Sequence, residues 1–244
     1  MTDQYERSAE FVDVMLTPHW TVLGPALAEA LRGAPGPVVD VGAGGGHGTR
    51  AIAQALPEAE IFAVEPSPGL RAVLMARVNE SPALRDRVTV LASGLLEAAL
   101  PPGLGAMVAM NVIGHFDPAG RRAIWELLAG RLLPGGRAVL NLQPPAEPTV
   151  VPQTRFSDLR IGRRRYEGWG RAEPAGPDLV TWHMTYRVVQ DGEPPEEVEV
   201  NYAWWVLGAD RLRAELTEHG LRVAPTGPAD LGLWLITRAE DVTA

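Results

Sequence analysis

The sequence predicts an α/β fold built around a mostly parallel sheet of seven strands. Short apolar segments alternate with segments of helical periodicity, which is typical of parallel strands joined by crossover helices. A glycine-rich turn follows the first apolar segment, and two later segments alternate as an antiparallel β-hairpin. At 244 residues, one α/β domain with an insertion is favoured over two separate domains.

The first half of the chain supplies the alternating elements. Phe11, Val12, Met15 and Leu16 have helical spacing, and the Thr17-Pro18-His19-Trp20 segment predicts a break before a new helix begins. Helices are expected over residues 20–32, 47–56, 67–78 and 118–132. The strands between them are expected at residues 38–41, 61–64, 88–91, 106–110 and 137–140.

The pattern changes after the fifth strand. Residues 143–180 are rich in proline, glycine and arginine and are too long for an ordinary loop, so we expect a functional segment there. Residues 182–190 and 198–206 then form the hairpin, whose aromatic face we assign to the core or to a homodimer contact. A helix at 209–219 and strands at 221–224 and 232–237 complete the sheet. The expected units are an N-terminal helical cap at 1–34, a core at 35–142, a cap insertion at 143–206 and the closing elements at 207–244.

The glycine-rich turn is the most informative segment. Glycines let the backbone adopt positive φ and let main-chain N–H groups lie against a ligand at a helix N-terminus. A dinucleotide fingerprint counted from Gly42 would place His47 at its third glycine, so that register fails. The pattern that fits is acid-x-Gly-x-Gly-x-Gly, formed by Asp40, Gly42, Gly44 and Gly46.

This pattern resembles the first motif of the class I S-adenosylmethionine (SAM) methyltransferases. The resemblance covers roughly residues 35–142. It implies a Rossmann-like three-layer sandwich, a last strand antiparallel to the others, and SAM as the cofactor with S-adenosylhomocysteine (SAH) as the product. In many small-molecule members of this family, an N-terminal helix and an insertion after the fifth strand together cap the substrate, and this chain has both.

The resemblance also implies roles for individual residues. Glu65, at the end of the second strand, would accept hydrogen bonds from both ribose hydroxyls, and Asp40 would orient the loop amides or the methionine amino group. The family usually has Gly-Asp after the third strand, where this chain has Ser93-Gly94, so the adenine contact would come from Ser93 or from the main chain near Leu95. The expected cofactor-binding residues are Asp40, Gly42, Ala43, Gly44, Gly46, Glu65, Pro66, Ser67, Ser93, Gly94, Leu95, Asn111 and Val112.

Histidine and aromatic residues supply the candidates for the acceptor site. His115 follows the fourth strand and is the first choice for a general base, because an unperturbed imidazole titrates near neutrality; alternatively, it only packs or hydrogen-bonds in its loop. His19 and His183 are weaker choices. The expected substrate-binding residues are Tyr5, His19, Trp20, His115 and Trp204. A further cluster either recognises a substrate anion or is a solvated loop: Arg160, Arg163, Arg164, Arg165, Tyr166, Trp169 and Arg171.

Composition narrows the range of partners. The net charge is −8, with 30 acidic and 22 basic residues that are all arginine, and this balance opposes binding to a phosphate backbone. The chain has no cysteine, which excludes disulfides and thiolate metal sites and suits a cytoplasmic protein. No apolar run is long enough to span a membrane, and no acid or histidine spacing specifies a metal site.

The function predicted from the sequence is therefore methyl transfer from SAM to an oxygen or nitrogen of a small-molecule acceptor, in specialised natural-product metabolism. Two alternatives keep the same cofactor: a methyltransferase-like protein that catalyses a different step such as a cyclisation, and a non-catalytic SAM-binding module. Formation of SAH distinguishes a methyltransferase from the protein that catalyses a cyclisation, because only methyl transfer yields SAH. A nicotinamide oxidoreductase is disfavoured by the register of the glycines.

Overall fold

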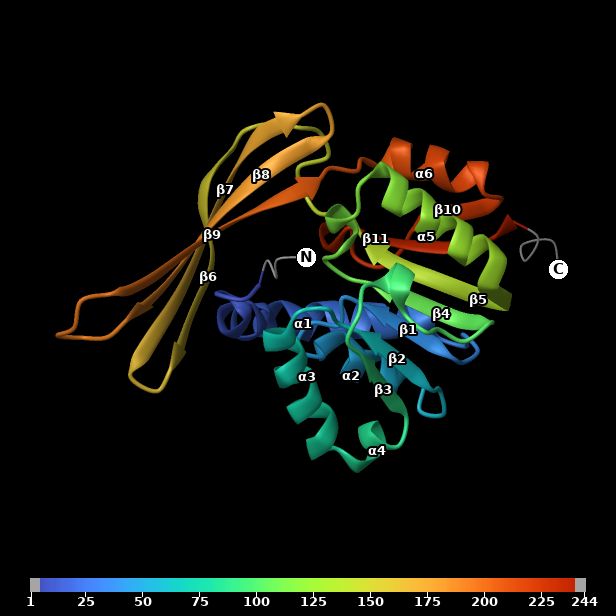
Figure 1. The fold of residues 1–244 in the computed structure, drawn as a ribbon, viewed down its shortest axis with the longest axis horizontal. Coiled ribbons are helices and arrows are strands. Elements are labelled where there is room, and N and C mark those ends of the chain that lie inside the picture. The colour runs from blue at the N-terminus through green and yellow to red at the C-terminus, as the bar shows by residue number, and fades with distance from the viewer. Residues whose placement is uncertain (1–4, 240–244) are drawn as a thin grey trace.

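The computed structural model describes residues 5–239, which form a seven-stranded sheet with helices on both faces and a separate antiparallel insertion (Figure 1). The strand order is β10-β11-β5-β4-β1-β2-β3. Strands β1 to β5 are parallel to one another. Strand β11 runs antiparallel to both β5 and β10, as the resemblance implied. The strands are β1 (Val38–Val41), β2 (Ile61–Val64), β3 (Val88–Leu91), β4 (Leu104–Ala109), β5 (Leu132–Asn141), β10 (Leu221–Pro225) and β11 (Leu233–Arg238).

Two helical layers cover this sheet. Helices α1, α2 and α3 pack on one face, and α5 and α6 pack on the other (Figure 1). The helices are α1 (Ala9–Leu31), α2 (His47–Ala55), α3 (Pro68–Glu80), α4 (Pro82–Arg85), α5 (Pro118–Arg131) and α6 (Ala209–Glu218), with 3-10 turns η1 (Leu95–Glu97), η2 (Ile113–His115) and η3 (Ala229–Leu231). The Rossmann-like three-layer sandwich is confirmed. No helix within residues 5–239 has the length and apolar character needed to cross a membrane.

The sheet topology places a binding crevice at one point. Strand order reverses between β1 and β4, because β2 follows β1 on one side whereas β4 returns to the other. Ligands of open α/β sheets bind beyond the carboxyl ends of the strands at such a switch point. The glycine-rich turn after β1 lies at this point.

Helix α1 corrects the predicted break at Thr17-Pro18. The chain remains helical from Ala9 to Leu31 and accommodates Pro18 and Pro25 inside the helix. A proline inside a helix removes one hydrogen bond, and here the Thr17 hydroxyl donates to the Asp13 carbonyl at 3.1 Å. Packing at both ends of the helix compensates for the loss, because its C-terminal half is buried against the sheet core and its N-terminal half against the insertion.

The insertion is a four-stranded antiparallel sheet in the order β6-β7-β8-β9. Its strands are β6 (Val151–Ile161), β7 (Arg164–Gly176), β8 (Leu179–Val189) and β9 (Glu196–Trp205). The predicted hairpin is confirmed as β8 and β9, and residues 143–180, which are too long for an ordinary loop, contain two further strands. Figure 1 shows this sheet extending away from the core, with the start of α1 beside it.

Candidate functional site

A cavity of about 880 Å³ lies at the carboxyl ends of β1, β2 and β4, between the sheet core and α1. The glycine-rich turn forms its floor, and residues of α1 form the facing wall. The loop after β3 and the η2 turn close two further sides. Helix α1 and the turn before it contribute Tyr5, Val12, Asp13, Leu16 and Trp20 to this wall.

The glycine-rich turn has a conformation that other residues rarely adopt. Gly42, Gly44 and Gly46 have φ values of 60°, 58° and 92°, in the left-handed region. Gly42 also permits a close approach, because a Cβ atom there would lie 2.7 Å from Cγ2 of Val112. The main chain of the turn therefore faces the cavity directly.

Glu65 is fixed against this turn by two backbone donors. The Gly44 N–H donates to Oε2 at 2.7 Å, and the Ser67 N–H donates to Oε1 at 2.8 Å. The carboxylate is 4% exposed and lines the cavity. Since a carboxylate oxygen can accept more than one hydrogen bond, both oxygens can still accept from a pair of neighbouring hydroxyls.

Asp40 lies behind the turn. It is 3% exposed, and the Thr49 hydroxyl donates to its Oδ2 at 2.6 Å. Burial raises the pKa of Asp40 to about 7; the Thr49 hydrogen bond opposes this rise and the charge of Glu65 adds to it. The structure thus places Asp40 where it supports the turn through α2.

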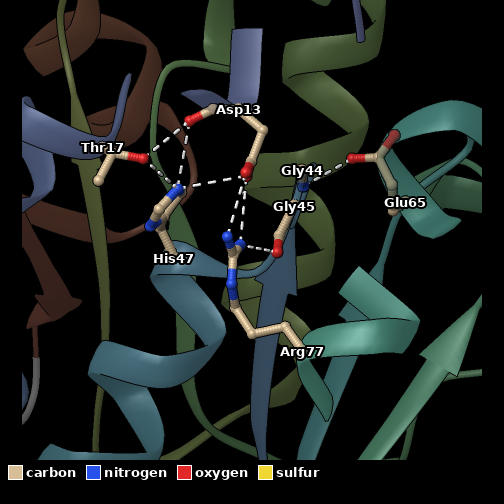
Figure 2. A network of polar contacts seen from close by, with 7 residues as sticks. All are labelled: Asp13, Thr17, Gly44, Gly45, His47, Glu65 and Arg77. Atoms are coloured by element: carbon tan, nitrogen blue, oxygen red, sulfur yellow. Dashed lines mark hydrogen bonds and ion pairs between the residues drawn. The ribbon is translucent and has the colours of Figure 1, made fainter. Parts of the chain in front are cut away.

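Asp13 links the N-terminal helix to the glycine-rich turn (Figure 2). Its carboxylate lies 3.1 Å from Nη2 of Arg77 and 3.2 Å from Nε2 of His47, and Arg77 also donates to the Gly45 carbonyl. Burial alone would raise the pKa of Asp13, but the hydrogen bonds from His47 and Arg77 outweigh it and lower the pKa to about 2. A Cβ atom at Gly45 would lie 1.8 Å from Oδ1 of Asp13, so only glycine fits beside this carboxylate. The sequence analysis missed Asp13; the available signal was one acid on the apolar face of a helix.

His115 meets the N-terminal segment across the cavity. Its Nε2 lies 2.8 Å from the Tyr5 hydroxyl, and the Trp204 ring packs edge-on at a centroid distance of 4.9 Å. Burial lowers the pKa of His115 to about 4, so the imidazole is neutral at physiological pH. A neutral imidazole next to a hydroxyl can accept a proton.

Residues 38–136 match the family model of a methyltransferase domain. The matched segment holds the glycine-rich turn, Glu65 and His115, and the fold around it is the one that the resemblance implied. That segment is therefore similar to a methyltransferase domain, and the fold of the chain is that of a solved SAM-bound methyltransferase. Solved structures of similar fold hold SAM in one case and SAH in another.

Comparison with known proteins finds several that share part of the sequence or the fold of this chain. It is 42% identical over 77 residues to a type II methyltransferase of Xanthomonas campestris pv. amaranthicola, a match that covers 31% of this chain and only 14% of that relative's length. The SAM-bound amino pentose methyltransferase of calicheamicin biosynthesis from Micromonospora echinaspora has a TM-score of 0.73 at 19% identity, covering 90% of this chain and 91% of that one. DesVI of Streptomyces venezuelae has a TM-score of 0.77 at 16% identity, covering 94% and 96%. A sugar N-methyltransferase from Streptoalloteichus sp ATCC 53650 has a TM-score of 0.67 at 16% identity, covering 90% and 87%.

Most of the residues predicted for the methyltransferase site line the cavity. They are Tyr5, Trp20, Gly42, Ala43, Gly44, Glu65, Pro66, Ser67, Gly94, Leu95, Asn111, Val112 and His115. Their side chains or main-chain groups come from five separate segments, which meet because the carboxyl ends of parallel strands share one edge of the sheet. The turn offers N–H groups and Glu65 offers acceptor oxygens, so these residues fit the adenosyl and methionine groups of SAM.

Five predicted residues lie away from the cavity lining: Asp40, Gly46, Ser93, His19 and Trp204. His19 is exposed on α1, because the neighbouring Trp20 occupies the helix face that meets the core. Trp204 packs against Gly114, where a Cβ atom would lie 2.0 Å from its ring, and it supports η2 from behind while Trp205 lines the cavity.

The other predicted groups belong to the insertion and do not line the cavity. His183 bonds Asn201 at 2.8 Å and Glu173 at 2.9 Å, well removed from the cavity residues in the fold. The arginine cluster spans β6, β7 and the turn between them, where Arg163 is exposed; within it, Arg165 pairs with Asp158.

Two further carboxylates line the cavity, and neither was among the predicted binding residues. Glu97 ends η1 and lines the cavity beside Gly94, where a Cβ atom would lie within 2.4 Å of its Oε2. Asp117 lines the rim and caps α5 by accepting a hydrogen bond from the Gly120 N–H at 2.6 Å. The signal for Glu97 was an acid three residues after Gly94, the position where the family usually has one.

Proposed function

We propose that this methyltransferase methylates an amino nitrogen of a small molecule, with amino sugars as the acceptor class. The observation that carries the proposal is the charge of the cavity. Four carboxylates line it, and among the described lining residues there is no arginine; the four are Asp13, Glu65, Glu97 and Asp117. Such a surface favours cationic ligands and disfavours carboxylate or phosphate acceptors.

The neighbours of similar fold agree with this choice of nucleophile. One is described as an amino pentose methyltransferase and another as a sugar N-methyltransferase. At identities of 16–19% these likenesses support the class of acceptor only through the shared fold. The acidic cavity is the independent argument for nitrogen over oxygen.

The residues of the chain have separable tasks in this proposal. When bound, SAM supplies a methyl group activated by its sulfonium. Glu65 and the glycine-rich turn hold the cofactor, and Glu97 accepts a hydrogen bond from the adenine amine in place of the usual acid after the third strand. Val12, Leu16 and Trp20 of α1 exclude water from the reacting groups.

The Tyr5–His115 pair removes the proton from the acceptor amine in this proposal. An amine attacks through its lone pair, so it must lose the proton that it carries at neutral pH. The Tyr5 hydroxyl can accept a hydrogen bond from the ammonium group while it donates to Nε2 of His115, and the imidazole relays the proton to solvent, because its lowered pKa does not let it keep the proton. The N-terminal segment and residues 143–206 form the cap over the acceptor in this scheme.

The test is a matched pair of acceptors. The purified protein is incubated with SAM and an amino sugar, and in parallel with the same sugar carrying a hydroxyl in place of the amine. SAH and a product heavier by one CH₂ are expected with the amino sugar only, measured by chromatography and mass spectrometry. SAH with the hydroxyl sugar alone would contradict the nitrogen assignment, and turnover without SAH would favour the cyclisation alternative.

A further inference from the structure

We propose that Asn141, a residue outside the cavity, is a positioning residue for the reaction: it locks Asn111 in a left-handed backbone conformation and thereby sets the place of His115. The proposal rests on the role of His115 given above. Its test includes a measurement on the ligand-free protein, so that the two can fail separately.

Asn111 has an unusual backbone. Its φ is 57°, and among residues 5–239 it is the one residue other than glycine with a positive φ. A single residue held in this region costs on the order of 1 kcal/mol, and asparagine tolerates it better than most. The residue follows β4 and lines the cavity, so the strain lies at the site.

Asn141 supplies the contacts that hold this conformation. It ends β5, is 4% exposed, and accepts a hydrogen bond from the Asn111 N–H at its Oδ1 at 2.6 Å. Its Nδ2 donates to Oδ1 of Asn111 at 2.7 Å. A backbone N–H can only donate, so the oxygen of Asn141 must face it, and this fixes the orientation of both carboxamides. One buried side chain therefore satisfies the main chain and the side chain of Asn111 together.

The turn that follows carries the effect to His115. After Asn111 the chain enters η2, in which the His115 N–H donates to the Val112 carbonyl at 2.9 Å. This turn is held on both sides: Val112 packs against Gly42, and the Trp204 ring packs against Gly114. The direction in which the chain leaves residue 111 decides whether His115 reaches Tyr5.

Substitutions can separate the backbone effect from the loss of a side chain. Asn141→Ala leaves the Asn111 N–H without its acceptor and favours relaxation out of the left-handed region. Asn111→Gly removes the side chain, but glycine adopts positive φ without strain. The double variant Asn111→Gly with Asn141→Ala should therefore recover the turn. Asn201→Ala, on the exposed outer face of the insertion, is the matched control.

The first measurement is the NMR titration of the His115 imidazole in ligand-free protein, assigned by loss of its signal in His115→Gln. The midpoint should rise in Asn141→Ala from about 4 toward the ordinary value, because the ring leaves its buried place, and it should return in the double variant. The second measurement is steady-state kinetics: kcat should fall about tenfold in Asn141→Ala with the KM for SAM nearly unchanged.

Two results would overturn the positioning role. One is an unchanged His115 titration in Asn141→Ala, and the other is a double variant whose His115 midpoint stays as far from wild type as that of Asn141→Ala. If Asn141→Ala does not fold, Asn141→Asp serves instead, because it keeps an acceptor for the Asn111 N–H and loses the donor to its side chain; an intermediate shift is then expected, and none would refute the role. A moved titration with unchanged kcat would support the positioning role and contradict His115 as the proton acceptor.

Discussion

Replacing Asp13 with asparagine should destabilise the protein by about 3 kcal/mol. The carboxylate of Asp13 is 10% exposed, with Nη1 of Arg77 at 3.2 Å, Nη2 at 3.1 Å and Nε2 of His47 at 3.2 Å. Hydrogen bonds to charged groups contribute about 1.5–3 kcal/mol each, and breaking a fully buried ion pair costs about 3–5 kcal/mol. Arg77 is 22% exposed, so solvent recovers part of that cost and the lower end applies.

The Asp13→Asn substitution should also weaken cofactor binding. Arg77 donates to the Gly45 carbonyl as well as to Asp13, so a released arginine no longer holds both α1 and the glycine-rich turn. Part of the binding energy for SAH must then order the turn. We expect about tenfold weaker SAH binding, which corresponds to about 1.4 kcal/mol.

Urea unfolding and calorimetric titration with SAH measure these two effects. Glu10→Gln is the control, because Glu10 is an exposed acid on the same helix. A double-mutant cycle with Arg77→Met should give a coupling of at least about 1 kcal/mol. The reasoning is refuted if Asp13→Asn stays within about 0.5 kcal/mol of Glu10→Gln, the range of ordinary surface substitutions.

Four further outcomes test the site. Glu65→Gln should weaken SAH binding about fiftyfold in calorimetry, because an amide nitrogen would face the Gly44 or Ser67 N–H; an unchanged dissociation constant contradicts the ribose role. His115→Ala should lower kcat about a hundredfold and leave SAH affinity near wild type, and equal turnover would mean that no base is needed there. Glu97→Gln should raise the KM for SAM about fivefold in steady-state assays, whereas a normal KM would argue against the adenine contact. Since the pKa of Asp40 is raised to about 7, the folded state binds this proton more tightly than the unfolded chain does. The free energy of unfolding of the ligand-free protein, measured with urea, should therefore fall by up to about 4 kcal/mol as pH rises from about 4 to about 7. Asp40→Asn should abolish that fall.

The cofactor half of the site could be predicted because its information is local in sequence. The strand, the glycine-rich turn and the following helix are contiguous from Val38 onward, and Glu65 lies one βα unit further along. Backbone requirements such as positive φ leave a direct trace in composition, namely glycine. The strands of the parallel sheet could also be predicted from the sequence, because buried strands are short apolar runs bounded by turn residues.

Asp13 and Asn141 could not be predicted in the same way. Asp13 contacts residues 34 and 64 positions away, and Asn141 contacts one 30 positions away. Each is a single polar residue whose role depends on which elements the fold brings together. Such a residue looks like any surface acid or amide until the partner is known.

The insertion shows a second limit of prediction from sequence: which face of a strand meets the cavity. Alternation along β9 shows that Trp204 belongs to one face and Trp205 to the other, but it does not show which face meets the cavity. That choice depends on how the insertion docks on η2 and α1, where Trp204 fills the space over Gly114 and Phe11 stacks on Tyr186. The same docking keeps α1 helical through Pro18, because apolar contacts on both halves of the helix outweigh the one hydrogen bond lost. A break at Pro18 would therefore be expected only in a chain without the insertion, and circular dichroism of a variant that lacks residues 151–205 would test this by showing less helix than α1 through α6 account for.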